Sequence, residues 1–207
     1  MRVVLGSASP RRRELLAAIV PSFEVRTAGV DETLTDRPRE DAARLAIAKA
    51  RAVLEADPSA VVVGADTIVA DATRSYGKPR DAVEAAEMLR DLAGRPHLVL
   101  TGVAIAVEGW SPIVAVSETV VEMVAMDEPT IAAYVASGRP LDKAGAYAIQ
   151  DEDVPTVERW HGCYCGVMGL PLWLTRELLY EYGVEAHAPL ERLPRCAMCP
   201  ERTGVIE

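Results

Sequence analysis

Apolar positions recur along this chain with two periods, and they predict both strands and helices. Residues 61–70 are apolar almost without a break, which is typical of a central strand covered on both faces. From about residue 40 to residue 56, apolar side chains recur at helical spacing and predict a long helix. Residues 98–108 and 113–124 alternate on either side of Gly109-Trp110, as the strands of a β-hairpin do. Further strands are expected at residues 2–5, 23–27 and 157–160, and further helices after Pro10, after Asp81, after Asp127 and after Pro171.

Length and charge narrow the class of protein. The chain has 207 residues, enough for one domain of ordinary size with a proper core. We assign residues 1–185 to this domain and residues 186–207 to a separate tail, because the pattern there dissolves into prolines, charges and a cysteine pair. The formal net charge of −9 argues against a nucleic-acid-binding protein, which usually has a basic surface. No apolar run approaches the ~20 residues of a membrane helix and no secretory signal is recognised, so we expect a cytoplasmic protein with no membrane partner.

The residues that follow the first expected strand predict a site for phosphate. Ser9 is expected to cap a helix, with Pro10 at its first position, where a missing N–H is harmless. The first turn then carries Arg11 and Arg12, although the helix dipole favours acidic residues there. Helix N-termini attract anions, and guanidinium groups bind phosphate oxygens in bidentate fashion. The alternative interpretation is an ordinary helix start with a solvated basic turn.

Asp66 is the second candidate, because it stands in the middle of the expected central strand. An ionised carboxylate there is unfavourable unless it is paired, hydrogen-bonded or bound to a metal, so we predict a catalytic or metal-binding role. A structural aspartate that caps a neighbouring loop is the alternative. If the polar turn at residues 71–76 closes a hairpin, Lys78 returns close to Asp66. Lys49 borders the apolar stripe of the long helix, and its spacing alone favours a surface lysine.

Several common catalytic sites are missing from the sequence. It contains no G-x-x-x-x-G-K-[ST] loop and no H-E-x-x-H pair, the corner at Ser7 lacks a G-x-S-x-G elbow, and the three histidines are scattered. Carboxylates and cations recur instead, without a nucleophile–histidine pair. This inventory suits phosphoryl chemistry, in which cations hold the oxygens and a metal with a carboxylate prepares a water molecule.

Five short motifs follow one another along residues 2–184. They are Ser7-Ala8-Ser9-Pro10-Arg11-Arg12 with Glu14-Leu15-Leu16, Gly64-Ala65-Asp66-Thr67, Gly77-Lys78-Pro79-Arg80, Asp142-Lys143-Ala144-Gly145-Ala146-Tyr147 with Ile149-Gln150, and Gly169-Leu170-Pro171-Leu172. In this order they resemble the signature of the Maf family of nucleoside triphosphate pyrophosphatases. The resemblance implies an α/β fold with an elongated, mixed, twisted sheet in two lobes around a central cleft, similar in outline to the inosine triphosphate pyrophosphatases.

The resemblance also implies the reaction. A nucleotide would be cleaved between its α- and β-phosphates to a monophosphate and pyrophosphate, with a divalent cation such as Mg²⁺, Mn²⁺ or Co²⁺. The loop that carries Gln150 resembles the branch of the family that acts on dTTP and UTP, rather than the branch that prefers 7-methylguanosine triphosphate. Two segments depart from the family pattern where a base could be recognised. They are Asp151-Glu152-Asp153, where glycine is usual, and Cys163-Tyr164-Cys165, where a Ser-Tyr pattern is usual.

The same resemblance assigns roles to individual residues. Asp66 would be the general base, with Glu32 assisting the metal or the water, so that both are candidate metal ligands. Lys78 would join them in the catalytic set. Ser7, Arg11 and Arg12 would hold the triphosphate, Lys49 would lie in the same cleft, contrary to its spacing, and Gln150 would take part in base recognition. A homodimer is expected from the family alone.

The four cysteines form two close pairs, Cys163 with Cys165 and Cys196 with Cys199. In a strand, Cys163 and Cys165 would point to the same face. The spacing of Cys196 and Cys199 is that of half a zinc site, and all four could complete one tetrahedral site if the tail folds back. Four reduced thiols are the simpler interpretation, and we prefer it at this point.

Two functions from different classes fit the sequence. The first is an enzyme that removes certain nucleoside triphosphates. The second is a nucleotide-sensing regulator of septum formation in cell division, in which partner binding matters and turnover is incidental. The presence of Asp66 beside the arginines and lysines favours the enzyme, since a sensor could lose its base. A phosphatase of smaller phosphomonoesters fits the residue inventory but not the ordered motifs.

Overall fold

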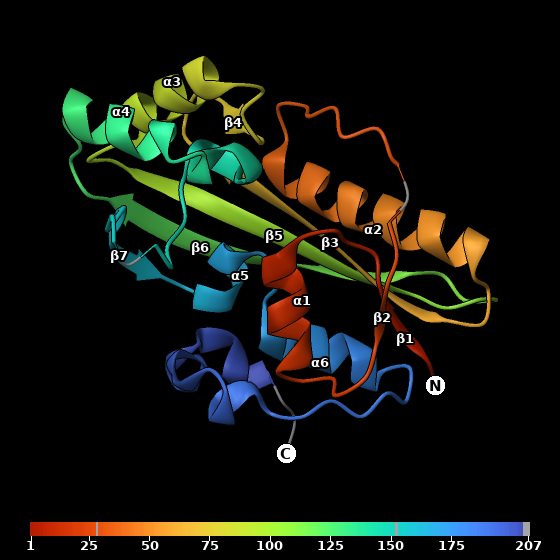
Figure 1. Ribbon diagram of the computed structural model, residues 1–207. Coiled ribbons are helices and arrows are strands. Elements are labelled where there is room, and N and C mark those ends of the chain that lie inside the picture. Colours follow the sequence, from red (N-terminus) through yellow and green to blue (C-terminus); the bar gives the residue numbers. More distant parts are fainter. Residues whose placement is uncertain (28, 152, 205–207) are drawn as a thin grey trace.

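A seven-stranded mixed sheet forms the centre of the computed structural model, which describes residues 1–27, 29–151 and 153–204, the last two by their backbone only (Figure 1). The strand order is β2-β1-β3-β5-β6-β7, with β4 paired to the end of β3. β1 pairs in parallel with β2 and β3, and the other pairs are antiparallel. The strands are β1 (Val3–Leu5), β2 (Glu24–Val25), β3 (Val61–Ala70), β4 (Ser75–Tyr76), β5 (Pro96–Ala106), β6 (Ile113–Met123) and β7 (Val157–His161).

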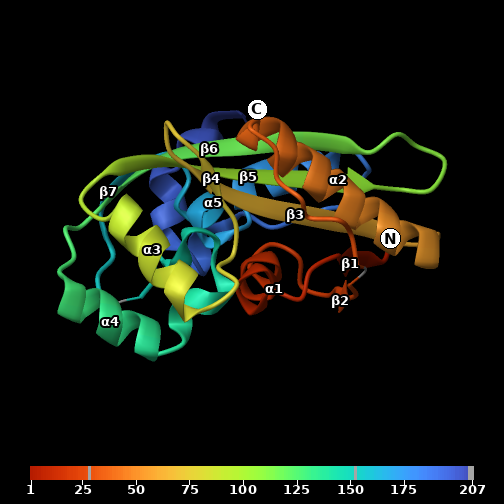
Figure 2. The same cartoon turned by 90° about the horizontal axis from the view of Figure 1, so that it is seen from above.

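The long helix α2 (Pro38–Ala56) covers one face of the sheet (Figure 2). It can approach closely because two strand positions opposite it are glycines. A Cβ atom on Gly64 would lie 2.3 Å from the carbonyl oxygen of Ala46, and one on Gly102 would lie 2.2 Å from that of Ala42. Such distances are impossible between real atoms. The alanine-rich face of α2 and the two glycines therefore bring the helix down onto β3 and β5.

Two separate groups of helices cover the other face. The first lobe consists of α1 (Pro10–Ala17), α5 (Tyr164–Met168) and α6 (Leu172–Tyr180), packed on the end of the sheet near β1. The second lobe consists of α3 (Ala82–Leu92), α4 (Glu128–Ala136) and the 3₁₀ turns η1 (Arg139–Asp142) and η2 (Ala144–Ala146). On β3, Ala65 belongs to the core of the first lobe and Val69 to that of the second. Thr67 lies between them, so a polar strip of the sheet separates the two cores.

Most of the predicted elements lie where the sequence placed them. The mixed sheet, the two lobes and the space between them agree with the expected fold class. α2 begins two residues earlier than expected, at Pro38, and the strand expected at residues 23–27 contains Glu24–Val25. Ser9 caps α1 and Asp81 caps α3, as predicted. No helix within the described ranges combines the length and apolarity that crossing a membrane requires.

The C-terminal end places the cysteines differently from a strand arrangement, because Cys163 caps the short helix α5 and Cys165 lies inside it. Residues 186–204 do not stand apart from the first lobe. They form three 3₁₀ turns that fold back onto the first lobe, and Cys196 and Cys199 are buried in its core. These turns are η3 (Pro189–Glu191), η4 (Pro194–Met198) and η5 (Pro200–Gly204).

Candidate active site

A cavity of about 540 Å³ opens between the lobes, beside an unpaired stretch of β3. On this edge of β3, β1 pairs with residues 61–63 and β4 pairs with residues 69 and 70. Among the described residues, no strand fills the gap between them, while β5 pairs along the whole opposite edge. Asp66 lies in this gap. A carboxylate is tolerated in an otherwise apolar strand because the missing neighbour opens it to the cavity.

The sequence-predicted residues come together in this cavity. Lys49 is among them, with a side chain only 13% exposed, so the surface position that its spacing favoured is wrong. The close approach of α2 to β3 carries its side chain inward. The predicted residues that line the cavity are Ser7, Arg11, Arg12, Glu32, Lys49, Asp66, Lys78 and Gln150.

One side of the cavity carries two carboxylates that share one lysine. Lys49 Nζ lies 2.6 Å from Asp66 Oδ1 and 2.7 Å from Glu32 Oε1. Burial acts to raise the pKa of Glu32, but the hydrogen bond from Lys49, with the charges of Lys49, Lys78 and Arg12, holds it below its ordinary value. Glu32 is therefore ionised at neutral pH. We call the residues Glu32, Lys49 and Asp66 the carboxylate side of the cavity.

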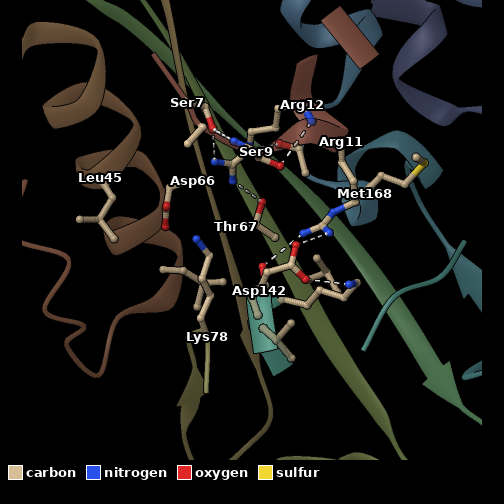
Figure 3. Close-up of a pocket in the computed structure, with 18 of the residues that line it drawn as sticks. Ser7, Ser9, Arg11, Arg12, Leu45, Asp66, Thr67, Lys78, Asp142 and Met168 are labelled. Atoms are coloured by element: carbon tan, nitrogen blue, oxygen red, sulfur yellow. Dashed lines mark hydrogen bonds and ion pairs between the residues drawn. The ribbon is translucent and has the colours of Figure 1, made fainter. Parts of the chain in front are cut away.

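The other side carries Arg12, whose guanidinium group is fixed by neutral acceptors (Figure 3). Nε donates to the carbonyl oxygen of Gly169 at 2.8 Å, and Nη2 donates to Thr67 Oγ1 at 3.0 Å. Nη1 donates to Ser7 Oγ at 3.3 Å. Burial lowers the pKa of Arg12, whereas the charge of Asp66 opposes this, and arginine stays protonated in proteins. The group is thus held in place without being neutralised.

Two threonines that the sequence analysis did not single out as site residues orient Arg12. Thr101 Oγ1 donates to the carbonyl oxygen of Gly166 at 2.8 Å and lies 3.0 Å from Thr67 Oγ1. Since the Thr101 hydrogen is used on Gly166, Thr67 donates to Thr101 and accepts from Arg12. In the sequence, Thr67 is only a polar residue next to Asp66, and Thr101 is a polar residue in the following expected strand. Their side chains meet because the register of β3 with β5 places Thr67 opposite Thr101.

Lys78 follows β4 and reaches the cavity, as the expected hairpin requires. Figure 3 shows its ammonium group directed into the cavity toward Asp66. Within the described part of the chain, no carboxylate lies within 4.0 Å of this group. Its charge nevertheless contributes to the lowered pKa of Glu32. We call Arg12 and Lys78 the cationic side of the cavity.

Arg11 differs from Arg12 because it already has an anionic partner. Its Nη1 lies 3.0 Å from Asp142 Oδ2, and Nη2 donates to the Asp142 carbonyl oxygen at 3.3 Å. Lys143 Nζ lies 2.7 Å from the other carboxylate oxygen of Asp142. Burial acts to raise the pKa of Asp142, but Lys143 and Arg11 lower it overall. This ion pair connects the first lobe to the second across the cavity (Figure 3).

The remaining wall of the cavity includes Tyr147 and Gln150. The Tyr147 hydroxyl lies 2.7 Å from His97 Nε2, and burial lowers the pKa of His97 to about 4, so the pair is neutral. Of the acidic residues that depart from the family pattern after Gln150, Asp151 accepts a hydrogen bond from Tyr134 at 2.6 Å. Glu152 lies outside the described residues. Tyr147 and Gln150 thus line the same cavity, and the Tyr147 hydroxyl is held by His97.

The balance of charge in the cavity is opposite to that of the whole chain. Five cationic and three anionic side chains line it, although the chain has a formal net charge of −9. Such a site attracts a polyanion with several phosphate oxygens. Asp66 and Glu32 also offer hard carboxylate oxygens, and Lys49 contacts one oxygen of each. Their remaining oxygens fit a divalent cation such as Mg²⁺ or Mn²⁺.

Comparison with known proteins gives one family and many similar chains. A family model described as Maf-like protein matches residues 2–182. A dTTP/UTP pyrophosphatase from Thermomicrobium roseum is 46% identical over 205 residues, which covers 97% of this chain and 94% of that protein. A dTTP/UTP pyrophosphatase from Symbiobacterium thermophilum is 45% identical, covering 88% and 94%. One from Xanthomonas axonopodis pv. citri is 42% identical, covering 86% and 97%.

Among solved structures, the Staphylococcus aureus Ham1 protein matches with a TM-score of 0.45 and 15% identity, over 60% of this chain and 72% of that one. A nucleoside-triphosphatase/dITP/XTP pyrophosphatase from Mycobacterium abscessus matches with a TM-score of 0.40 and 16% identity, over 61% and 76%.

Proposed function

The chain belongs to the Maf family, and on this premise we propose that it is a nucleoside triphosphate pyrophosphatase that hydrolyses dTTP and UTP. The products are the nucleoside monophosphate and pyrophosphate. The observation that carries the proposal is the division of the cavity, with two carboxylates on one side and, on the other, two cations that have no carboxylate partner among the described residues. The names of the similar chains support the choice of substrates.

In this proposal Asp66 acts as the general base. Lys49 binds Oδ1, so Oδ2 accepts the proton from a water molecule. The oxygen of that water attacks the α-phosphorus, and the bond from this phosphorus to the bridging oxygen of the β-phosphate breaks. Pyrophosphate leaves with the bonding electrons. Each turnover consumes one water and releases the monophosphate, pyrophosphate and a proton.

Arg12 and Lys78 stabilise the negative charge that develops on the leaving pyrophosphate. Fixed charges are effective here because they need no reorganisation when the bond breaks. Thr67, Ser7 and the Gly169 carbonyl oxygen hold the guanidinium group in one orientation before the substrate binds. Arg11 joins the same site by exchanging Asp142 for a phosphate oxygen.

Asp66 and Glu32 would hold the divalent cation that pyrophosphatases of this kind generally need. Both carboxylates face the same ammonium group, so they lie close enough to contribute oxygens to one ion. When bound, the metal supplies positive charge to the phosphates and lowers the pKa of a water molecule. Glu32, whose pKa is already held below its ordinary value, remains available as a ligand at neutral pH.

Gln150 is proposed to recognise the base. Its amide can donate one hydrogen bond and accept another, which matches the neighbouring N–H and C=O groups of a uracil or thymine ring. Tyr147, whose hydroxyl lies 2.7 Å from His97 Nε2, lines the same cavity. This arrangement supports a pyrimidine preference together with the names of the similar chains.

The test is release of pyrophosphate from a panel of eight ribo- and deoxyribonucleoside triphosphates with Mg²⁺, Mn²⁺ or Co²⁺. We expect turnover of dTTP and UTP with kcat/KM at least about tenfold above that of the purine nucleotides. Release of pyrophosphate without orthophosphate would place the cleavage between the α- and β-phosphates. Absence of turnover on every nucleotide, or release of orthophosphate alone, would contradict the proposal.

A further inference from the structure

The refolded C-terminal residues bring all four cysteines of the chain together at the end of α5 away from the cavity. Each of the four side chains is buried. The Sγ atoms of Cys165 and Cys196 lie 3.0 Å apart. The Sγ atoms of Cys163 and Cys199 and a carboxylate oxygen of Glu201 lie within 4.8 Å of one another. We call these five residues the cysteine cluster.

The four sulfur-bearing residues share one place, because all four are buried in the core of the first lobe. Each pair joins one cysteine of α5 or its cap to one cysteine of the tail. The cluster therefore joins two segments that are about thirty residues apart in the sequence, Cys165 and Cys196 being separated by 31.

The surroundings of the sulfurs fix their positions. The backbone N–H of Gly166 donates to Cys163 Sγ at 3.3 Å, and Trp173 Nε1 donates to the carbonyl oxygen of Cys196 at 2.9 Å. Glu201 Oε2 is buried and has no hydrogen-bond partner among the described residues. A buried carboxylate oxygen beside the sulfurs of Cys163 and Cys199 marks a place that lacks positive charge.

We propose that the thiolates of Cys163, Cys165, Cys196 and Cys199 bind one zinc ion, which fastens the C-terminal tail to α5. Zinc prefers thiolate ligands in a tetrahedron with Zn–S bonds of ~2.3 Å, which puts the sulfurs roughly 3.8 Å apart. The Cys165 and Cys196 sulfurs, 3.0 Å apart, are somewhat closer than this, and the Cys163 and Cys199 sulfurs lie within 4.8 Å of each other. Small shifts of the two pairs toward one another complete the tetrahedron, and Glu201 lies next to it without being a ligand.

The zinc site has a consequence for the cavity, because α5 carries two of the carbonyl groups that orient Arg12. The Gly166 carbonyl oxygen accepts from Thr101, and the Gly169 carbonyl oxygen, at the other end of α5, accepts from Arg12 itself. The ion would fix the first end of α5 and so restrict the movement of the second. Its role is structural, and it is separate from any cation that Asp66 and Glu32 hold.

Metal analysis of the full-length, untagged protein tests the proposal. The protein is passed through a gel-filtration column in buffer with EDTA, which strips a cation held by two carboxylates. We expect roughly one zinc ion per chain to remain, with X-ray absorption showing four sulfur neighbours at ~2.3 Å. Zinc far below one per chain, with either four titratable thiols or two disulfides by mass spectrometry, would overturn it. So would the visible absorption of an iron–sulfur cluster.

Variants separate this site from the active site. Replacing Cys196 and Cys199 together by serine should reduce the zinc content at least tenfold and lower the melting temperature. Met198→Ala is the matched control, since Met198 lies between the two cysteines, is 88% exposed and should keep its zinc. Asp66→Asn should also keep it, whatever its activity. Loss of zinc in Glu201→Gln, or an oxygen neighbour in the absorption spectrum, would overturn the four-sulfur assignment.

Discussion

The two sides of the cavity differ in the partners of their charged groups. On the carboxylate side, Lys49 lies 2.6 Å from Asp66 and 2.7 Å from Glu32, so both carboxylates are paired within the protein. On the cationic side, Arg12 donates to two hydroxyl groups and a carbonyl oxygen, and Lys78 has no carboxylate within 4.0 Å in the described ranges. The carboxylate side keeps one negative charge in excess, which suits a cation, whereas the cationic side suits an anion.

This difference indicates how the site divides its work. The carboxylate side has its geometry set by Lys49 before any ligand arrives, as a general base needs. On the cationic side, Arg12 is partly buried, Lys78 is exposed, and neither has a carboxylate within 4.0 Å among the described residues. This unpaired positive charge favours the entry of a polyanion. Binding energy from the triphosphate would therefore come mainly from the cationic side. Changes to the two sides should separate turnover from binding.

The largest effect is expected from Asp66→Asn. The amide keeps the shape of the side chain but cannot accept the proton from water, so kcat should fall by about 10³-fold. Binding of the nucleotide should change little, because Arg12 and Lys78 are untouched. Turnover is measured as pyrophosphate release, and binding by calorimetry with dTTP. Normal hydrolysis in this variant would show that Asp66 is not the base.

A change on the cationic side should act on binding as well as on turnover. Arg12→Lys keeps the charge but loses the planar group that binds Gly169, Thr67 and Ser7 at once, so kcat/KM should fall by about 10²-fold. Thr67→Val, which removes one of these contacts, should lose less, about tenfold. Steady-state kinetics with dTTP measure both. An Arg12→Lys enzyme with unchanged KM and kcat would remove the distinction between the two sides.

The role of Lys49 can be read from the pH dependence of kcat/KM. Glu32 has a pKa below its ordinary value partly because of Lys49, so its ionised form persists as the pH falls. In Lys49→Gln that support is lost, the pKa of Glu32 rises, and the acid limb of the profile should move up by about one pH unit. Lys49→Arg keeps the charge and should leave the limb in place. Identical profiles for the two variants would contradict the pairing.

The sequence indicated which residues line the cavity better than it indicated how their side chains are placed and paired. The local patterns around Ser9, Asp66 and Asp81 correspond to a cap, a strand and a cap, since each depends on neighbours in the chain. Lys49 could not be placed from spacing, because its inward position requires Gly64, opposite α2, to let the helix approach. The resemblance to a family placed it in the cleft, and packing explains why.

Contacts between distant segments were also beyond the sequence. The tail is rich in prolines and charges, so its pattern gave no periodic face that would dock on the first lobe. Its burial depends on two cysteines and their partners around α5, 31 residues earlier in the chain for Cys165 and Cys196. The pairing of Arg11 with Asp142 spans 131 residues and depends on how the lobes face each other.

The smallest effect is expected at the Arg11–Asp142 pair. Arg11 is a cation of the cavity, but unlike Arg12 and Lys78 it is paired with a carboxylate. The Asp142 side chain is 57% exposed, so the pair should contribute less than ~1 kcal/mol to the free energy of unfolding. In Asp142→Asn, Arg11 no longer has to exchange a carboxylate for phosphate, and KM for dTTP should fall about two- to threefold with kcat nearly unchanged. Arg11→Gln is the counterpart and should raise KM. A tenfold rise of KM in Asp142→Asn would show instead that Asp142 contributes to substrate binding directly, and the carboxylate side would then extend to both lobes.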